Sequence, residues 1–346
     1  MDPLILKGLI ACVPVIVCLV AFVVMDVFKL MKPHEVLELM AGGALAAAAA
    51  YLTNGGVLDA FPFQISLYSQ AAAPVVEETL KGLVVVAFFA ANRMGYIVDA
   101  AISGFAIGAG FSLVENLFYL RVFSDAGIGL WLVRGLGTAI MHGGATAIMA
   151  AVSILLFTPR LKKRADQFRL NPLFFLPGLA LAMGLHAAFN HFPQAPLIDM
   201  VVMAVAVPAV LMVTFAVGDQ VAQRWLAADE SAHLKLLEAM DAGAFAETQQ
   251  GRDIAALATR LGERAGDLNE YVHIHVELVA RAEANLLALQ AQETTDLGAK
   301  LRARFDRLHA LEKSLGRPVV MAVRQHLRFS RNDLWEMHEL EEDVPA

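Results

Sequence analysis

The segment AAPVVEETLKGLVVVAFFA, residues 72–90, is apolar enough to cross a bilayer, yet it carries two glutamates and a lysine. Glu77 and Lys81 are four residues apart, so one helical turn would bring them together, with Glu78 about 100° further around the helix. An ionisable side chain at the centre of a bilayer costs about 2.5–3.5 kcal/mol on insertion scales, so it usually faces a partner or a hydrated cavity. We expect those partners on other membrane spans.

Three further apolar segments carry polar groups that hydrocarbon would reject. The segment GFAIGAGFSLVENLFYL contains Glu115 and Asn116, the segment TAIMHGGATA contains His142, and the segment GLHAAFNHF contains His186 and Asn190. His186 and Asn190 are four residues apart and therefore share one face of a helix. Each of these segments is a candidate source of partners for the acids at 77 and 78.

The spacing around Glu115 indicates a face that packs against protein. Gly104, Gly108, Phe111 and Glu115 step by three or four residues along one stripe of a helix. Gly104 and Gly108 form a GxxxG pair, the arrangement of small residues that lets two membrane helices approach closely. The sequence therefore predicts a close helix–helix contact on the same face as Glu115.

Composition places these groups in a polytopic membrane protein. The chain of 346 residues is 58% hydrophobic and has a mean hydropathy of +0.57, which is too apolar for an ordinary soluble domain. Apolar runs near the ~20 residues that span a bilayer predict an all-α transmembrane domain over residues 1–218. Its seven predicted spans are residues 5–27, 37–53, 71–91, 98–120, 132–157, 173–192 and 197–218.

Basic residues predict the orientation of these spans. Lys29, Lys32 and Arg93 follow odd-numbered spans, as does the basic run RLKKRADQFR, whereas Arg121 and Arg134 lie at span edges, where long side chains reach the interface. By the positive-inside rule the amino terminus lies outside the cell inner (plasma) membrane and the carboxyl tail lies in the cytosol.

The polar groups of four spans converge at one depth in this topology. At ~1.5 Å per residue, Glu77, Glu78, Glu115, His142 and His186 all fall within roughly 7–15 Å of the same membrane face. The convergence does not depend on the orientation, because the spans alternate direction in either case. We therefore expect one shared polar site just below the outer face.

From residue 219 the chain changes character. Residues 219–346 are rich in Ala, Leu, Glu and Arg, with apolar residues at three- and four-residue spacing and charges of both signs between them. This pattern predicts a cytosolic α-helical domain that packs, self-associates or binds a cytosolic partner. The mixed charges and the lack of a nucleic-acid-binding motif indicate no nucleic-acid partner.

Carboxylates and imidazoles around a hydrated pocket suit hydrolysis. Glu77 or Glu78 would act as a general base toward water. His186 and Asn190 would then donate hydrogen bonds to the oxyanion that forms when water attacks an amide.

A metal-dependent mechanism fits the same residues. Two histidines and a carboxylate, here His142, His186 and Glu115, are the usual ligands of a catalytic Zn²⁺ that keeps an open position for water. The base would again be Glu77 or Glu78. The zinc motif HExxH is absent, so the residues permit hydrolysis with or without zinc.

At these residues the sequence resembles the PrsW family of intramembrane proteases, relatives of the CAAX-prenyl-protease and bacteriocin-processing enzymes. The motifs that carry the resemblance are EETLK (77–81), FSLVEN (111–116), His142 and HAAFN (186–190). The resemblance covers roughly residues 35–220. It implies a polytopic protease that cuts membrane-associated proteins, with anti-sigma factors as the best-known substrate type.

The resemblance also implies roles for single residues. Glu77 and Glu78 match the motif whose glutamate activates water in the prenyl-protease relatives, and His186 and Asn190 match the last motif. Supporting positions in these motifs are Lys81, Phe111 and Asn116. The sequence departs at Glu115, where those relatives carry a histidine, so the choice between metal and glutamate-only mechanisms stays open.

Two other functions fit the buried acids. A cation- or proton-coupled transporter would use the carboxylates to bind its ion, but the inverted repeats and broken helices typical of that class are not found in the sequence. A catalytically inactive membrane scaffold would use the C-terminal domain to recruit a cytosolic partner.

Overall fold

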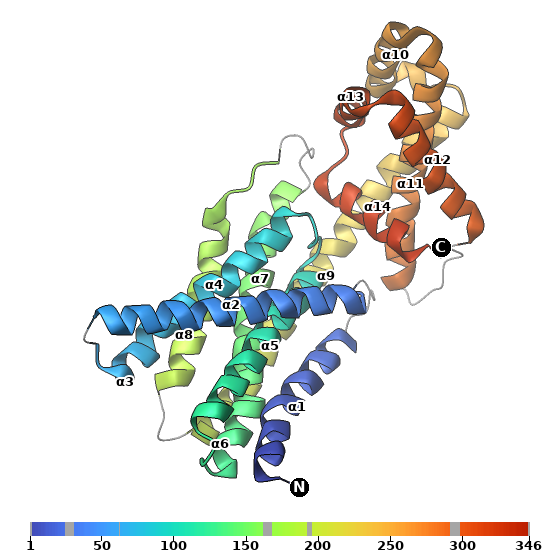
Figure 1. Cartoon of the computed structure of the whole chain (residues 1–346). Helices are drawn as coiled ribbons and strands as arrows, with labels where there is room; N and C mark the ends of the chain where they lie inside the picture. Colours follow the sequence, from blue (N-terminus) through green and yellow to red (C-terminus); the bar gives the residue numbers. More distant parts are fainter. Residues whose placement is uncertain are drawn as a thin grey trace. The chain divides into compact units, whose positions relative to one another are not determined.

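The computed structural model describes residues 2–24, 31–61, 63–161, 168–191, 196–290 and 298–344, and the regular elements in these ranges are all helices, as predicted. The chain divides into two compact units (Figure 1). We call them the membrane unit, Met1–Phe157 with Leu170–Asp219, and the C-terminal unit, Thr158–Arg169 with Gln220–Ala346.

The membrane unit contains the long apolar helices. Its elements are α1 (Pro3–Val24), α2 (Pro33–Ala60), α3 (Ile65–Leu67), η1 (Tyr68–Ala72), α4 (Ala73–Ala90), α5 (Ile97–Val122), α6 (Ile128–Leu132), η2 (Val133–Gly137), α7 (Thr138–Leu161), η4 (Pro172–Phe175), α8 (Leu176–His191) and the first part of α9 (Pro196–Asp241).

Six helical stretches among the described residues are long and apolar enough to cross a membrane. They are α1, α2, α5, Ile128–Phe157, Pro172–His191 and Met200–Val217. These stretches confirm a polytopic all-α membrane protein. The third predicted span, α4, is not among them, because its 18 residues include Glu77, Glu78 and Lys81. Its membrane crossing stays a prediction.

Small residues bring α2 against α5. The second predicted span, residues 37–53, is part of α2, a helix of 28 residues. This helix crosses α4 and α5 in Figure 1 and packs on both. A Cβ added at Gly43 would overlap the carbonyl oxygen of Ile107, and one added at Gly110 would overlap that of Met40. Only glycine at these positions allows the two backbones to lie this close.

Helix α5 is the centre of the membrane unit. It packs on α1, α2 and α4, and the residues of its first four turns are almost all buried, as expected of a helix that is apolar all round. Gly104 and Gly108 face the backbone of α7, where an added Cβ would overlap the carbonyl oxygens of Thr146 and His142. The predicted close contact through the GxxxG pair is thus confirmed, and it fixes the backbone at His142.

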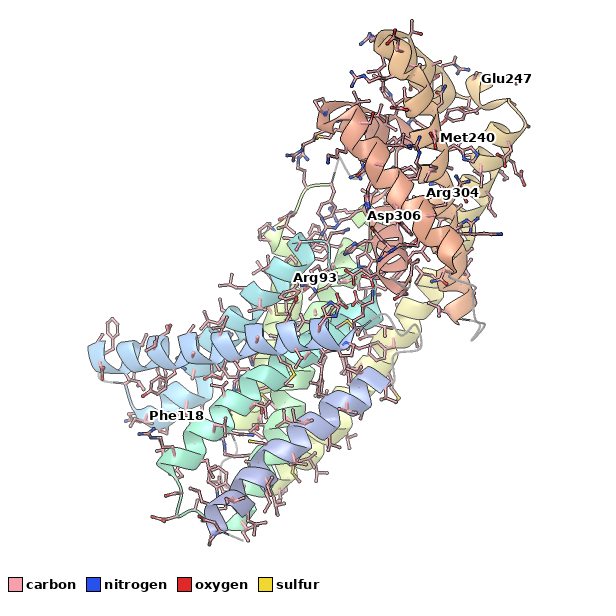
Figure 2. The ribbon with its side chains drawn as sticks, turned by 45° about the vertical axis from the view of Figure 1, so that its right-hand side comes forward. Arg93, Phe118, Met240, Glu247, Arg304 and Asp306 are labelled. Atoms are coloured by element: carbon pink, nitrogen blue, oxygen red, sulfur yellow. The ribbon has the colours of Figure 1, made fainter. Side chains whose placement is uncertain are left out.

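Aromatic contacts hold the two ends of this bundle. At one end the ring of Phe89 in α4 lies 4.6 Å from that of Phe157 in α7. At the other end the ring of Phe118 in α5, labelled in Figure 2, lies 4.7 Å from that of Tyr51 in α2. Contacts of this kind add about 0.5–1.5 kcal/mol each beyond the area that they bury.

The C-terminal unit is a separate helical bundle. It consists of the end of α9, η5 (Phe245–Glu247), α10 (Gln249–Leu261), η6 (Gly262–Arg264), α11 (Ala265–Gln290), α12 (Ala299–Leu315), α13 (Arg317–Leu327) and α14 (Arg331–Asp343). The predicted boundary at residue 218 falls inside α9, which continues through it. Helix α11 is central and packs on α10, α12 and α14. Arg304 of α12 (Figure 2) pairs with Glu277 of α11 at 2.9 Å.

The core of this bundle also contains a histidine. His275 in α11 is fully buried, and its Nδ1 lies 2.9 Å from the hydroxyl oxygen of Tyr271. Burial, with the nearby charge of Arg324, lowers the pKa of His275 to about 3. The side chain is therefore neutral at physiological pH and forms part of the core.

Replacing Gly108 with alanine should destabilise the membrane unit by about 1–3 kcal/mol, the usual cost of overpacking a core. The added Cβ has no space beside the carbonyl oxygen of His142. Thermal unfolding of the detergent-solubilised protein, followed by circular dichroism, measures the change. Gly184→Ala in α8 is the matched control, because a Cβ there meets no described atom of another element within 4 Å. An unchanged midpoint for Gly108→Ala would contradict the close approach of α5 and α7.

Candidate active site

The acids and histidines singled out in the sequence meet at one end of the membrane unit. Glu77 and Glu78 lie in the first two turns of α4, and His142 lies in the second turn of α7. Glu115 lies about two turns before the end of α5, and His186 lies about one and a half turns before the end of α8. Because α4 and α7 begin where α5 and α8 end, the four helices bring these side chains to one level.

Two short π-helical segments precede the site. η1 leads directly into α4, and η2 leads directly into α7. Glu77 and His142 each follow the end of such a segment by five residues. Segments with π-helical hydrogen bonds are often found at functional sites, where the wider turn shifts the direction of the side chains that follow.

Glu78 is the ionic centre of the site. Its Oε1 accepts a hydrogen bond from Lys81 Nζ and lies 2.7 Å from His186 Nδ1. Lys81 Nζ also lies 2.9 Å from His142 Nδ1. Glu78 and Lys81 are both fully buried, so each neutralises a charge that hydrocarbon would reject. The expected pair of Glu77 with Lys81 is not the one that forms, because Glu77 points instead toward α2.

The two carboxylate oxygens of Glu77 differ in their hydrogen bonding. Its Oε1 accepts a hydrogen bond of 3.2 Å from Asn54 Nδ2 of α2. Its Oε2 is buried, has no hydrogen-bond partner in the part of the chain that the structure describes, and lies 3.8 Å from His186 Nε2. The Oε2 of Glu78 is likewise buried and has no hydrogen-bond partner within the described ranges. Buried carboxylate oxygens rarely lack partners in native proteins, so each of these two atoms marks a position for a ligand, an ion or a water molecule.

Glu115 lies on the other side of His142. Its Oε2 accepts a hydrogen bond of 2.7 Å from Arg134 Nη2 and lies 3.1 Å from His142 Nε2. The guanidinium of Arg134 also stacks over the ring of Tyr119, 3.7 Å from its centroid. Sequence reasoning placed Arg134 only at a span edge, and its role as the counter-ion of Glu115 was missed.

Aromatic rings close the space around the two histidines. The rings of His142 and His186 are nearly perpendicular, with centroids 4.8 Å apart. Phe111 packs against His142 at 4.9 Å, and Lys81 Nζ lies 4.5 Å from the centroid of the Phe111 ring. Phe111 thus lies between the GxxxG face of α5 and the ionic cluster.

The two asparagines of the motifs lie outside this cluster. Asn116 donates to the carbonyl oxygens of Ala11 and Arg134, at 2.8 and 3.2 Å. Asn190 donates to the carbonyl oxygen of Ser69 in η1 at 2.9 Å. Both side chains connect neighbouring elements, and within the described residues neither is hydrogen-bonded to the acids or histidines of the site.

Three side chains of the site form a group that could hold a metal ion. Glu77, His142 and His186 each offer one ligand atom, and these atoms lie within 4.8 Å of one another. Two histidines and a carboxylate are a common set for catalytic Zn²⁺. The free Oε2 of Glu77 fits this use, and so does His186, whose Nδ1 is held by Glu78 while Nε2 faces Glu77.

This group contains Glu77 where the sequence suggested Glu115. The carboxylate of Glu115 is already bound by Arg134. Both ring nitrogens of His142 have polar neighbours, Lys81 and Glu115, so binding of an ion by His142 requires one of these contacts to lengthen.

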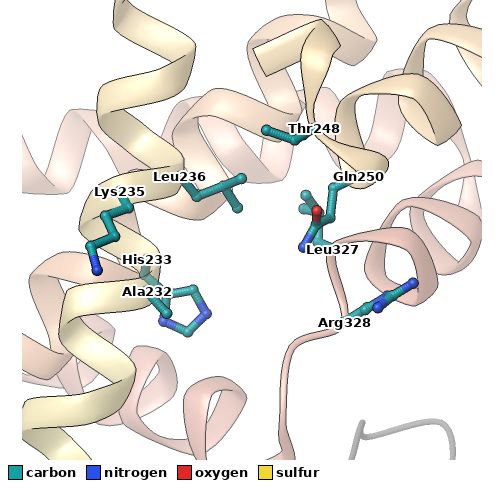
Figure 3. Close-up of a pocket in the computed structure, with 8 residues that line it drawn as sticks. All are labelled: Ala232, His233, Lys235, Leu236, Thr248, Gln250, Leu327 and Arg328. Carbon is teal, nitrogen blue, oxygen red and sulfur yellow. The ribbon is translucent and has the colours of Figure 1, made fainter. Parts of the chain in front are cut away.

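The C-terminal unit has a pocket of a different kind. Its volume is about 360 Å³, and Figure 3 shows His233 of α9 and Gln250 of α10 on opposite sides of it. The other residues that line it are Ala232, Lys235, Leu236, Thr248, Leu327 and Arg328. No residue of the four sequence motifs is among them, so the hydrolytic candidate remains the site in the membrane unit.

Replacing Lys81 with methionine should destabilise the membrane unit by about 3–5 kcal/mol, because Glu78 would remain as a buried anion without its cation. The double variant Lys81→Met/Glu78→Gln should recover most of this loss, since it removes both charges. Thermal unfolding in detergent measures both effects. A double variant as unstable as Lys81→Met alone would show that the pair is not coupled.

A known protein family matches most of the membrane unit. The PrsW-protease family, described as PrsW family intramembrane metalloprotease, matches residues 32–218. The matched region contains every acid and histidine of the site and more than half of the 346 residues. Among curated proteins and solved structures, none matches the chain at a significant level. The chain belongs to the PrsW family of intramembrane metalloproteases.

Proposed function

We propose that this intramembrane protease hydrolyses peptide bonds of membrane-associated proteins at the cluster of Glu77, Glu78, His142 and His186. The single observation that carries the proposal is the pair of buried carboxylate oxygens, Glu77 Oε2 and Glu78 Oε2, that lie near His186 and have no hydrogen-bond partner among the described residues. Anti-sigma-factor-type regulators are the proposed substrate class, because the motifs resemble those of proteases that act on them.

The proposed metal ligands are Glu77, His142 and His186, with Zn²⁺ as the candidate ion. A bound zinc ion would supply Lewis acidity and lower the pKa of a coordinated water. Glu78 orients His186 by accepting the Nδ1–H, which leaves Nε2 directed toward Glu77. Glu115, held by Arg134, fixes His142 from the other side. In zinc sites a ligand histidine commonly donates its other ring N–H to a carboxylate, which fixes the orientation of the ring.

Glu78 is the proposed general base. Its Oε1 is held by Lys81 and His186, whereas its Oε2 is free to take a proton from the attacking water. The water oxygen then bonds to the carbonyl carbon, the carbon–nitrogen bond breaks, and the proton passes from Glu78 to the leaving amine. Asn190, one turn after His186, keeps its proposed role as a hydrogen-bond donor to the developing oxyanion: one N–H of its amide donates to the carbonyl oxygen of Ser69, and the second is the proposed donor.

The proposed topology places the site near the outer face of the plasma membrane. Arg93 follows α4 at the end opposite Glu77, where it pairs with Glu35 and Glu38 at the start of α2. Because basic residues favour the cytosolic side, the end of α4 near Arg93 is proposed to be cytosolic, and the end near Glu77 is then on the outer side. The amino terminus is then external and the C-terminal unit cytosolic. Lys29 and most of the basic run after α7 lie outside the described residues.

The role of the C-terminal unit is a separate proposal. Its mixed surface charges and its bundle of α10–α14 suit self-association or binding of a cytosolic partner, which would bring the protease to its substrate or control access.

Glu78→Gln and His186→Ala should each lower kcat/KM by about 10²–10⁴-fold, because the first removes the proposed general base and the second a proposed metal ligand. The assay is cleavage of a single-span membrane substrate by the full-length protein in proteoliposomes. His191→Ala is the matched control, because this exposed histidine lies on the same helix, five residues after His186. Full cutting by both site variants would refute hydrolysis at this cluster.

Elemental analysis distinguishes the two carboxylates that were considered as ligands. Purified protein should contain about one zinc ion per chain, and Glu77→Gln and His142→Ala should lose it. Glu115→Gln should retain most of the zinc, because its carboxylate is bound by Arg134. Loss of zinc in Glu115→Gln with retention in Glu77→Gln would restore the ligand set suggested by the sequence. Active protein without zinc would favour the glutamate-only mechanism.

A further inference from the structure

A polar relay reaches Glu77 from two elements that carry none of the sequence motifs. Asn54 of α2 donates its Nδ2–H to Glu77 Oε1 at 3.2 Å. The hydroxyl of Tyr68, the first residue of η1, donates to Asn54 Oδ1 at 2.9 Å. Tyr68 is 4% exposed and Asn54 is half-buried. The relay thus connects α2, η1 and α4.

The relay selects which oxygen of Glu77 is free. The last torsion of a glutamate side chain is broad and roughly two-fold, so an unheld carboxylate would rotate between its two oxygens. A charge-assisted hydrogen bond on Oε1 removes this freedom. It leaves Oε2, the atom 3.8 Å from His186 Nε2, directed at the site.

Tyr68 fixes the direction of the amide that makes this bond. The oxygen and the amide nitrogen of an asparagine side chain have nearly the same shape, and only their hydrogen bonds distinguish them. With Tyr68 donating to Oδ1, the Nδ2–H group must point at Glu77. A reversed amide would place an oxygen against the carboxylate, which is repulsive. Tyr68 therefore acts on Glu77 only through Asn54.

We infer that Asn54 and Tyr68 are positioning residues for Glu77, and that together they set the carboxylate geometry on which metal binding and turnover depend. The inference rests on the proposed function, since it assigns Glu77 to the reacting site. It adds two residues to that site, from segments whose sequence offers no motif.

A purely structural role, in which Asn54 and Tyr68 only hold α2 against η1, predicts a different result in the measurements of metal affinity and turnover. Loss of a purely structural contact would lower the stability of the protein, but it would leave metal affinity and turnover of the folded protein unchanged. A substrate-binding role would raise KM and leave kcat unchanged. A positioning role lowers kcat and metal affinity together, since outer contacts of a ligand are typically worth 10–100-fold in either quantity.

The test uses the full-length protein with the size-matched variants Asn54→Leu and Tyr68→Phe. The Zn²⁺ dissociation constant is measured by competition with a chromophoric chelator, and kcat and KM are measured on a single-span substrate in proteoliposomes. Asn54→Leu should weaken Zn²⁺ binding and lower kcat by about 10–100-fold, with KM little changed. Tyr68→Phe should have a smaller effect of about 3–10-fold, as expected for the loss of one neutral hydrogen bond.

The double variant is the decisive measurement. Because Tyr68 acts only through Asn54, adding Tyr68→Phe to Asn54→Leu should cause no further loss, whereas independent effects would multiply. Matched controls are Tyr51→Phe, which removes a hydroxyl from a tyrosine that is 58% exposed, and Thr53→Val, which removes a hydroxyl that donates to the carbonyl oxygen of Ala49 in its own helix. Both controls should keep the parent zinc affinity and kcat.

Each other outcome overturns the inference. Unchanged zinc affinity and kcat in Asn54→Leu, with both lost in Glu77→Gln, would leave the proposed function intact and remove the positioning role. If the effects of Asn54→Leu and Tyr68→Phe multiply in the double variant, the two residues act independently and Tyr68 does not act through Asn54. If Glu77→Gln itself binds zinc and cuts, Glu77 is not part of the reacting site, and the assignment of its role and this inference fail together.

Discussion

The membrane unit depends on a constraint of solvation: a charge that leaves water for an apolar helix bundle must meet its partners inside the protein. Glu78 meets this constraint with a single oxygen, which is shared by Lys81 and His186. The same pair of contacts sets the direction of His186 and brings Lys81 to His142. The contacts that neutralise the buried acid therefore also arrange the candidate catalytic histidines.

Close helix packing makes this arrangement achievable. Side chains on four helices can share hydrogen bonds of about 3 Å only where the backbones approach closely. Gly104 and Gly108 let α5 reach α7 beside His142, while Gly43 and Gly110 let α2 reach α5. In a membrane, where apolar side chains gain little by leaving lipid, such contacts between small residues are a main source of helix association. Geometry at the site thus depends on glycines that perform no chemistry.

Family membership indicates the class of enzyme, whereas the local contacts indicate which residues are available as metal ligands. The match over residues 32–218 places the chain among intramembrane metalloproteases, but it does not say which carboxylate faces the ion. The contacts favour Glu77, because Arg134 already holds Glu115. Residues 220–346 of the C-terminal unit lie outside the match, and the core of this unit, with the buried neutral His275, is that of an ordinary helical bundle.

Hydropathy and residue spacing alone determined the all-α membrane fold, the glycine face of α5 and the convergence of acids and histidines at one level, because bilayer thickness and helical periodicity act locally along the chain. Spacing could not determine which acid pairs with Lys81, since Glu77 and Glu78 both lie within reach of it on one helix. Nor could it find Asn54, Tyr68 or the pairing of Arg134, because these partners lie on elements distant in sequence. Only the packing of α2, η1 and η2 against the site decides those contacts.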